Sequence, residues 1–251
     1  MIRTFFLLVF FFPIYSYNSI AKSESKSEKS EQINMSFIEV ARDGDFTKVK
    51  DLFSRGASVK ARNRFGNSAI LLAASEGHLE IVKFLIQKKT QIDLSNLNKQ
   101  TPLMGAAKNG HLPTVNYLIS QGASINSLNI INFTALTYAV YEQHESIVES
   151  LLKNGADTAI LDKTKKRVLD YAAAKGSLKI TELLVKSGAN INQQSSNMLS
   201  PLMWAAGYGH KSIVEFLIKS GANKELKDDR GRTAAEIAGE TGYIEISAIL
   251  K

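Results

Sequence analysis

The sequence predicts an all-α fold, a solenoid of about seven helix–turn–helix units with a projecting β-turn or hairpin between successive units. A pattern of residues recurs every 33 positions from residue 35 to residue 251, with no insertion or deletion. Within each period the apolar residues follow helical spacing, and glycines mark the ends of two short helices. A unit of this size cannot bury its own apolar stripe, so successive units must stack on one another.

The composition limits the class of protein. The chain has 251 residues, of which 44% are hydrophobic, and it has no Cys. That is enough apolar material for a folded core but too little for a polytopic membrane protein. The absence of Cys excludes disulfides, thiolate nucleophiles and Cys-ligated zinc. The formal charge of +7 is modest for this length, so we expect no specific nucleic-acid partner.

The N-terminal residues 1–21 have the pattern of a secretory signal peptide. Arg3 precedes an uncharged apolar run from Phe5 to Tyr15, and small residues occupy Ser19 and Ala21. The run contains Pro13 and falls short of the ~20 residues that span a bilayer. We therefore expect cleavage near Ala21, an exported protein that is periplasmic or secreted, and membrane contact that is peripheral at most.

Residues 22–34 alternate Ser with charges of both signs and include one large apolar residue, Ile33. This composition predicts a disordered, charged tether. The repeat region follows it over residues 35–251. We place its units near residues 35–61, 62–94, 95–127, 128–160, 161–193, 194–226 and 227–251.

A short helix is expected at the start of each unit. Thr101 and Ser200 place a hydroxyl N-cap before Pro102 and Pro201, and Pro at the first helical position lacks only a donor that the helix does not use. Paired Ala residues allow a neighbouring helix to approach closely. A glycine such as Gly110 then ends the helix in a left-handed turn. The corresponding N-cap positions are Ser68, Thr101, Thr134, Arg167, Ser200 and Thr233.

A second helix and a polar turn complete each unit. In residues 79–86 the apolar residues recur at helical spacing, and in most units Gly-Ala closes this helix. The turn that follows is rich in Asn, Asp, Lys and Ser. A turn glycine is present at Gly66 and Gly231, whereas other residues stand at the equivalent positions, where a positive φ costs on the order of 1 kcal/mol. These residues are Lys99, Asn132, Lys165 and Met198.

The repeated residues resemble the ankyrin repeat, whose hallmark is a Thr-Pro-Leu-His-x-Ala-Ala, Gly-His, Leu-Leu and Gly-Ala series at this period. The resemblance covers residues 35–251 and implies a concave face, lined by turn tips and inner helices, that holds other proteins. Two departures predict weak joints. Lys89 and Thr90 replace Gly-Ala in the second unit, and Arg167 replaces the capping hydroxyl in the fifth.

The histidines argue against catalysis. All four fall at one repeat position, which indicates a structural role in hydrogen bonding between adjacent loops, whereas a catalytic base or a metal ligand is needed once in a converging cluster. The acidic residues are scattered as well. We therefore expect neither an enzyme nor a metal or other cofactor. The four residues are His78, His111, His144 and His210.

The resemblance places the partner-binding residues at non-framework positions, where this chain has large apolar side chains. Such side chains commonly anchor protein interfaces. We expect a monomer that binds another protein through them. For Tyr138, Tyr171 and Trp204, which share one repeat position, packing against adjacent repeats is an equal alternative. The predicted binding residues are Ile130, Ile131, Phe133, Tyr138, Tyr141, Leu199, Trp204 and Tyr208.

A basic cluster lies between the predicted binding residues of the fourth repeat and those of the sixth. It either steers an acidic partner or keeps a solvated turn soluble, and the sequence favours neither reading. The leading hypothesis is a non-enzymatic, protein-binding scaffold of the extracytoplasmic space. The second is electrostatic attachment to an anionic surface such as lipid head groups, lipopolysaccharide or nucleic acid. The basic residues are Lys163, Lys165, Lys166, Arg167 and Lys175.

Overall fold

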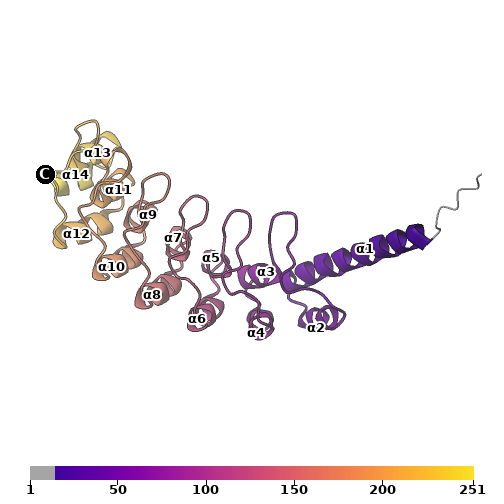
Figure 1. Cartoon of the computed structure of the whole chain (residues 1–251). Coiled ribbons are helices and arrows are strands. Elements are labelled where there is room, and N and C mark those ends of the chain that lie inside the picture. The colour runs from indigo at the N-terminus through magenta and orange to yellow at the C-terminus, as the bar shows by residue number, and fades with distance from the viewer. Residues whose placement is uncertain (1–14) are drawn as a thin grey trace, which may run out of the picture.

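A computed structural model describes residues 15–251 and shows a stack of paired helices (Figure 1). Residues 1–14 of the expected signal peptide lie outside the described residues. Over residues 15–251 the structure has fourteen α-helices and no regular strand, which confirms the all-α prediction. The first helices of the pairs are α1 (Tyr15–Arg42), α3 (Ala69–Ser75), α5 (Pro102–Lys108), α7 (Ala135–Tyr141), α9 (Val168–Lys175), α11 (Pro201–Gly207) and α13 (Ala234–Glu240).

The second helices form the other layer of the stack. Successive first helices pack against one another, as do successive second helices, so the chain forms two parallel layers of helices. The hairpins between pairs project beyond the first layer on one side (Figure 1). The second helices are α2 (Phe46–Ser54), α4 (Leu79–Gln87), α6 (Leu112–Ser120), α8 (Glu145–Lys153), α10 (Leu178–Lys186), α12 (Lys211–Lys219) and α14 (Ile244–Leu250), and a short 3₁₀ helix spans Ser196–Met198.

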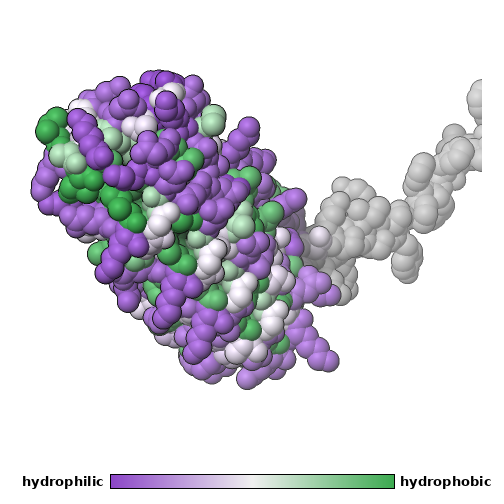
Figure 2. All heavy atoms as spheres, turned by 90° about the vertical axis from the view of Figure 1, so that its left-hand side faces the viewer, coloured by the Kyte–Doolittle hydropathy of each residue, from purple (hydrophilic) through white to green (hydrophobic). Residues whose placement is uncertain are grey.

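The core lies between the two layers. Leu103, Leu136 and Leu151 are fully buried there, and Ala106 and Ala139 leave room for the close approach of neighbouring first helices. The outer surface, seen from the C-terminal end in Figure 2, is mostly hydrophilic with hydrophobic residues between. Burial of apolar side chains from adjacent units is therefore what holds the stack together.

The predicted hydroxyl caps are confirmed. Thr101 Oγ1 accepts a hydrogen bond from the Met104 amide at 3.3 Å, and the other Ser and Thr residues at this position act likewise. Arg167 cannot. In its repeat the Asp170 carboxylate accepts a hydrogen bond from the Arg167 amide at 2.8 Å instead, so the N-terminus of α9 keeps half of a capping box.

The hairpins share one geometry. In the hairpin of the fourth repeat the Asn129 amide donates to Phe133 O at 3.1 Å and the Asn132 amide donates to Asn129 O at 3.0 Å. Asn132 itself has φ of 61°, so the loop is a tight turn with a left-handed bulge residue. The Ile130 amide donates to Asn98 O of the preceding hairpin at 3.0 Å. The tips therefore form a hydrogen-bonded row.

The turn residues have the left-handed backbone conformation that the sequence predicts. The non-glycine turn residues adopt positive φ, as Gly66 and Gly231 do. Lys89, in the predicted weak joint after α4, has φ of 61°, and the hydroxyl of the buried Thr90 has no hydrogen-bond partner. The residues in question are Lys99, Asn132, Lys165 and Met198.

The histidines join adjacent repeats, as predicted. Each ring packs against a left-handed glycine in the preceding repeat, and a Cβ at Gly110 would lie only 2.9 Å from the His144 ring. Three rings also bond to a backbone carbonyl of that repeat. These bonds join Nε2 of His78 to Arg42 O (2.8 Å), of His144 to Lys108 O (2.9 Å) and of His210 to Ala174 O (3.0 Å).

The contact between the fourth and fifth repeats differs from the other glycine–histidine contacts in both residues. Gln143 stands where the other repeats have the left-handed glycine, with φ of 62°. The residue that faces this position from the next repeat is Ser177 rather than His. A side chain at residue 143 is thus accommodated where the ring is missing.

The expected tether over residues 22–34 differs from the structure, in which these residues are helical and belong to α1. The chain has neither Gly nor Pro from residue 14 to residue 43, and Lys, Glu and Gln are good helix formers. The C-terminal part of α1 is anchored by Phe37, Ile38 and Ala41, all fully buried. A helix nucleated there extends outward at little cost per residue.

No helix within residues 15–251 is both long and apolar enough to cross a membrane.

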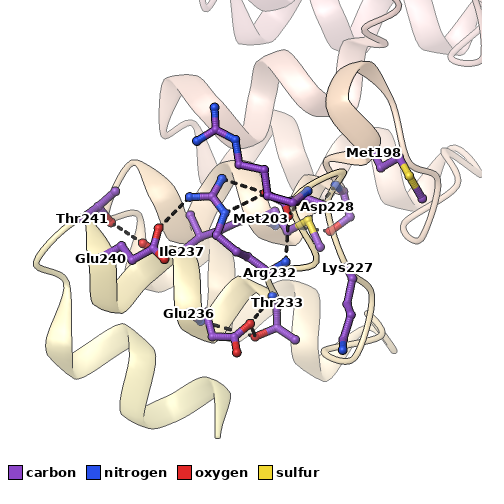
Figure 3. A network of polar contacts seen from close by, with 12 residues as sticks. Met198, Met203, Lys227, Asp228, Arg232, Thr233, Glu236, Ile237, Glu240 and Thr241 are labelled. Carbon is purple, nitrogen blue, oxygen red and sulfur yellow. Dashed lines mark hydrogen bonds and ion pairs between the residues drawn. The ribbon is translucent and has the colours of Figure 1, made fainter.

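The last hairpin is held by a charged network (Figure 3). The Arg232 guanidinium donates to Asp228 at 2.7 Å and to Glu240 at 2.6 Å. Burial opposes ionisation of Asp228, but hydrogen bonds from the Arg232 amide and guanidinium outweigh it and lower the pKa of that carboxyl. This network closes the C-terminal end of the stack.

Candidate functional site

Six aromatic side chains lie in two contacting groups from the fourth to the sixth repeat, and the Lys166 ammonium lies over one ring of each group. Phe133 ends the hairpin before α7, and the other five lie on the first helices α7, α9 and α11 or directly after α11. Phe133 and Tyr171 have ring centroids 5.8 Å apart, and Tyr141 and Tyr171 5.6 Å apart, in edge-to-face contact. Trp204 and Tyr208 stack at 6.1 Å. The aromatic row consists of Phe133, Tyr138, Tyr141, Tyr171, Trp204 and Tyr208.

A pocket of about 330 Å³ opens in this row. Its walls come from three successive first helices and the hairpin before α9. Another hollow, of about 520 Å³, lies between the second helices α6 and α8 and has mainly small polar side chains, so it offers no comparable anchor. The aromatic pocket is lined by Tyr141, Lys166, Asp170, Tyr171, Ala174, Lys175, Trp204 and Tyr208.

Two ammonium groups lie over the rings of the pocket. Lys175 Nζ is 3.9 Å from the centroid of the Tyr141 ring, and Lys166 Nζ is 4.7 Å from that of Trp204. These are cation–π distances. Among the described residues neither lysine forms an ion pair. The indole N–H of Trp204 is buried and has no acceptor among them.

The two carboxylates near the pocket are committed to the fold. Asp170 is 2% exposed, and burial raises its pKa to about 6 against the opposing effect of the Arg167 amide. Asp162 is buried and accepts hydrogen bonds from the Thr164 and Lys166 amides and from the Tyr171 hydroxyl. Burial, together with Asp162, raises the pKa of Tyr171, so this hydroxyl remains a donor.

The comparison with family models decides the family. Models of ankyrin repeats match residues 37–129, 127–195 and 169–251. The chain belongs to the ankyrin-repeat family. A comparison with curated proteins gives no significant match. Ankyrin repeats generally serve as protein–protein interaction modules and are typically non-enzymatic.

The predicted binding residues fall into three places on the ankyrin stack. Tyr141, Trp204 and Tyr208 line the aromatic pocket. Phe133 and Tyr138 extend the row beside it. Trp204 and Tyr138 also pack against the core, as the packing alternative for that repeat position expects. The three remaining residues lie outside the pocket. Ile130 and Ile131 are exposed at a hairpin tip, and Leu199 packs against the core.

The structure divides the predicted basic cluster. Lys166 and Lys175 lie at the aromatic pocket, while Lys163 and Lys165 are exposed at the hairpin tip. Arg167 lies outside that pocket, and its Nε donates to Ala159 O at 3.1 Å. The five residues therefore lie in three different settings.

Sequence reasoning did not single out Asp170 or Ala174. A partial signal for Asp170 was present, because its repeat position holds Leu71, Met104, Thr137 and Met203, and only the last repeat has another carboxylate there, Glu236. A carboxylate at a buried framework position marks a local change of environment. Residues 15–251 contain no group of three His, Cys, Asp or Glu side chains placed to hold a metal.

Proposed function

We propose that this ankyrin-repeat protein is exported and holds a segment of another protein in the aromatic pocket, without chemistry of its own. The observation that carries the proposal is the pocket itself, in which aromatic faces and two lysine ammonium groups surround a hollow of about 330 Å³. Ankyrin repeats generally bind proteins, and the exposed aromatic area of the pocket supports binding at this position.

The energetics favour a protein segment as the occupant. Tyr208 is 55% exposed and Tyr141 39% exposed, so each has apolar area left to bury against a partner. Aromatic side chains bury a large area with few rotatable bonds, and their truncation commonly costs more than 1 kcal/mol in interfaces. The aromatic row continues the contact surface along three repeats.

The decisive experiment is capture from a native extract with residues 22–251, followed by binding measurements with the purified partner. The pocket variant carries Tyr141→Ala and Tyr208→Ala. A matched control carries Phe65→Ala and Leu97→Ala, since these side chains are also exposed but lie on other hairpins. We expect the parent and the control to retain the partner at high salt and the pocket variant to lose it, with unchanged helix content.

Equal retention by all three proteins would refute the pocket assignment. Retention of anionic material at low salt alone, by the parent and the pocket variant equally, would favour attachment to an anionic surface instead.

Export is supported by the signal-peptide pattern of residues 1–21. Cleavage near Ala21 would leave Lys22 as the N-terminal residue. Mass spectrometry of the native protein tests this. A mature chain that still begins at Met1 would contradict it.

A further inference from the structure

We infer that the segment bound in the aromatic pocket is acidic, with an apolar or aromatic side chain that enters the pocket and carboxylates on either side that pair with Lys166 and Lys175. The inference rests on the proposed function and specifies its ligand. It follows from the charge around the pocket, from the donors that the pocket contains and from the shape of the aromatic row.

Charge is the first argument. Most of the ion pairs in residues 15–251 join neighbouring positions of one element or turn, as Lys83 and Glu80 do at 2.8 Å. Lys166 and Lys175 lie over aromatic rings instead and have no carboxylate partner among the described residues. Their charges are thus available to a ligand.

The nearby acids form no ion pair with these two lysines. Asp162 is buried beneath its own hairpin and accepts from two backbone amides, and Asp170 is buried against the N-terminus of α9. Both carboxylates are hydrogen-bonded within the fold, and Asp170 also lines the pocket, where the charge of Lys166 acts to lower its pKa. Lys163 and Lys165 at the adjacent hairpin tip add positive charge close by, which steers an acidic segment toward the pocket.

Donors without acceptors are the second argument. Each of the two lysine ammonium groups offers three hydrogen-bond donors. A carboxylate supplies the acceptors that the pocket lacks. Its hydrogen bonds with an ammonium group are stronger than those of an amide, because both partners are charged.

Shape is the third argument. The two groups of the aromatic row extend through three repeats, with the Lys166 ammonium between them, so the surface is longer than one small anion. A pocket of about 330 Å³ accepts a single large side chain. An extended peptide fits both features, since one side chain enters the pocket while its neighbours lie along the row.

The test uses Trp204, which is the single tryptophan of the chain, as a fluorescent reporter inside the pocket. The probes are nine-residue peptides without tryptophan, each with a central Leu, Phe or Tyr and with Glu, Gln or Lys at the two flanking positions. At about 0.15 M salt, where screening acts over ~8 Å, we expect Glu peptides to bind about tenfold more tightly than their Gln twins, a difference of ~1.4 kcal/mol. Lys peptides should bind most weakly.

Two charge variants test which lysines cause the preference for Glu peptides. Lys166→Gln with Lys175→Gln should abolish the preference for Glu over Gln. Lys163→Gln with Lys165→Gln removes the same charge at the hairpin tip and should leave most of the preference intact. Equal affinity for the Glu and Gln peptides would overturn the inference, and so would a preference that persists without Lys166 and Lys175.

The failure of this inference can be told from failure of the proposed function. If Glu and Gln peptides bind equally and the Tyr141→Ala, Tyr208→Ala variant binds neither, the pocket holds protein segments without requiring acids. If no peptide binds, or phosphatidylglycerol vesicles alone change the Trp204 fluorescence, the inference is wrong and the capture experiment alone decides the function.

Discussion

The joint after α4 should become more stable when Lys89 and Thr90 are replaced by Gly and Val. Lys89 has a left-handed backbone with φ of 61°. Thr90 is 7% exposed, and its hydroxyl has no hydrogen-bond partner among the described residues. In five other repeats this joint has Gly with positive φ followed by Ala, as at Gly122 and Ala123. Lys89 and Thr90 therefore each impose a separate cost.

The two costs can be estimated. A left-handed conformation costs an ordinary residue about 1 kcal/mol more than it costs glycine, and the greater freedom of glycine in the unfolded chain offsets part of that gain. A buried hydroxyl without a partner costs about 1–3 kcal/mol, because its hydrogen bonds to water are lost on folding. Val has nearly the shape of Thr without the hydroxyl. We expect the double variant to gain about 2 kcal/mol in free energy of unfolding.

Urea unfolding followed by circular dichroism measures this gain. Lys89→Ala and Thr90→Ser are the matched controls, because the first retains the backbone strain and the second retains the hydroxyl. Neither should stabilise the protein. The reasoning would be refuted if Thr90→Val were no more stable than the parent, or if Lys89→Ala stabilised as much as Lys89→Gly.

Three further outcomes follow from other contacts. Because burial raises the pKa of Asp170 from 3.8 to about 6, the parent should lose about 3 kcal/mol of stability as the pH rises from about 4 to above 6; Asp170→Asn should remove this slope in urea titrations at pH 5 and pH 8. Gly110→Ala should destabilise the stack by about 2 kcal/mol, since the new Cβ meets the His144 ring, and adding His144→Ser should recover part of the loss in melting temperature. Arg232→Gln should destabilise the protein by leaving the buried Asp228 without its cation, and hydrogen exchange should increase first in α13 and α14.

The helix pairs could be predicted because each is determined locally and repeated. Hydroxyl caps, paired alanines and left-handed glycines recur at fixed positions, so one misleading residue such as Arg167 does not hide the pattern. The histidine contacts could be predicted for the same reason. The same two positions are in contact in several pairs of adjacent repeats. An interpretation made for one of these contacts can therefore be checked against the others.

The aromatic pocket could be predicted only in part. Repeat position indicates that Tyr138 and Trp204 are equivalent, but the pocket depends on contacts between non-equivalent positions, such as Tyr141 with Tyr171. Those contacts depend on side-chain rotamers and on how the repeats stack, which a one-dimensional pattern does not contain. The helical form of residues 22–34 was missed for a different reason. Their composition describes a solvated segment, whereas the buried residues that anchor the helix lie beyond it.

The contact between glycine and histidine rings also restricts how the array can change length. Loss of residues 95–127 by unequal recombination would bring Gly77 against His144, a pairing that the intact joints already use. Loss of residues 161–193 would instead bring Gln143 against His210, where a Cβ and a ring compete for one space. Unless a second substitution accompanies the loss, the fifth repeat cannot be deleted without the fourth.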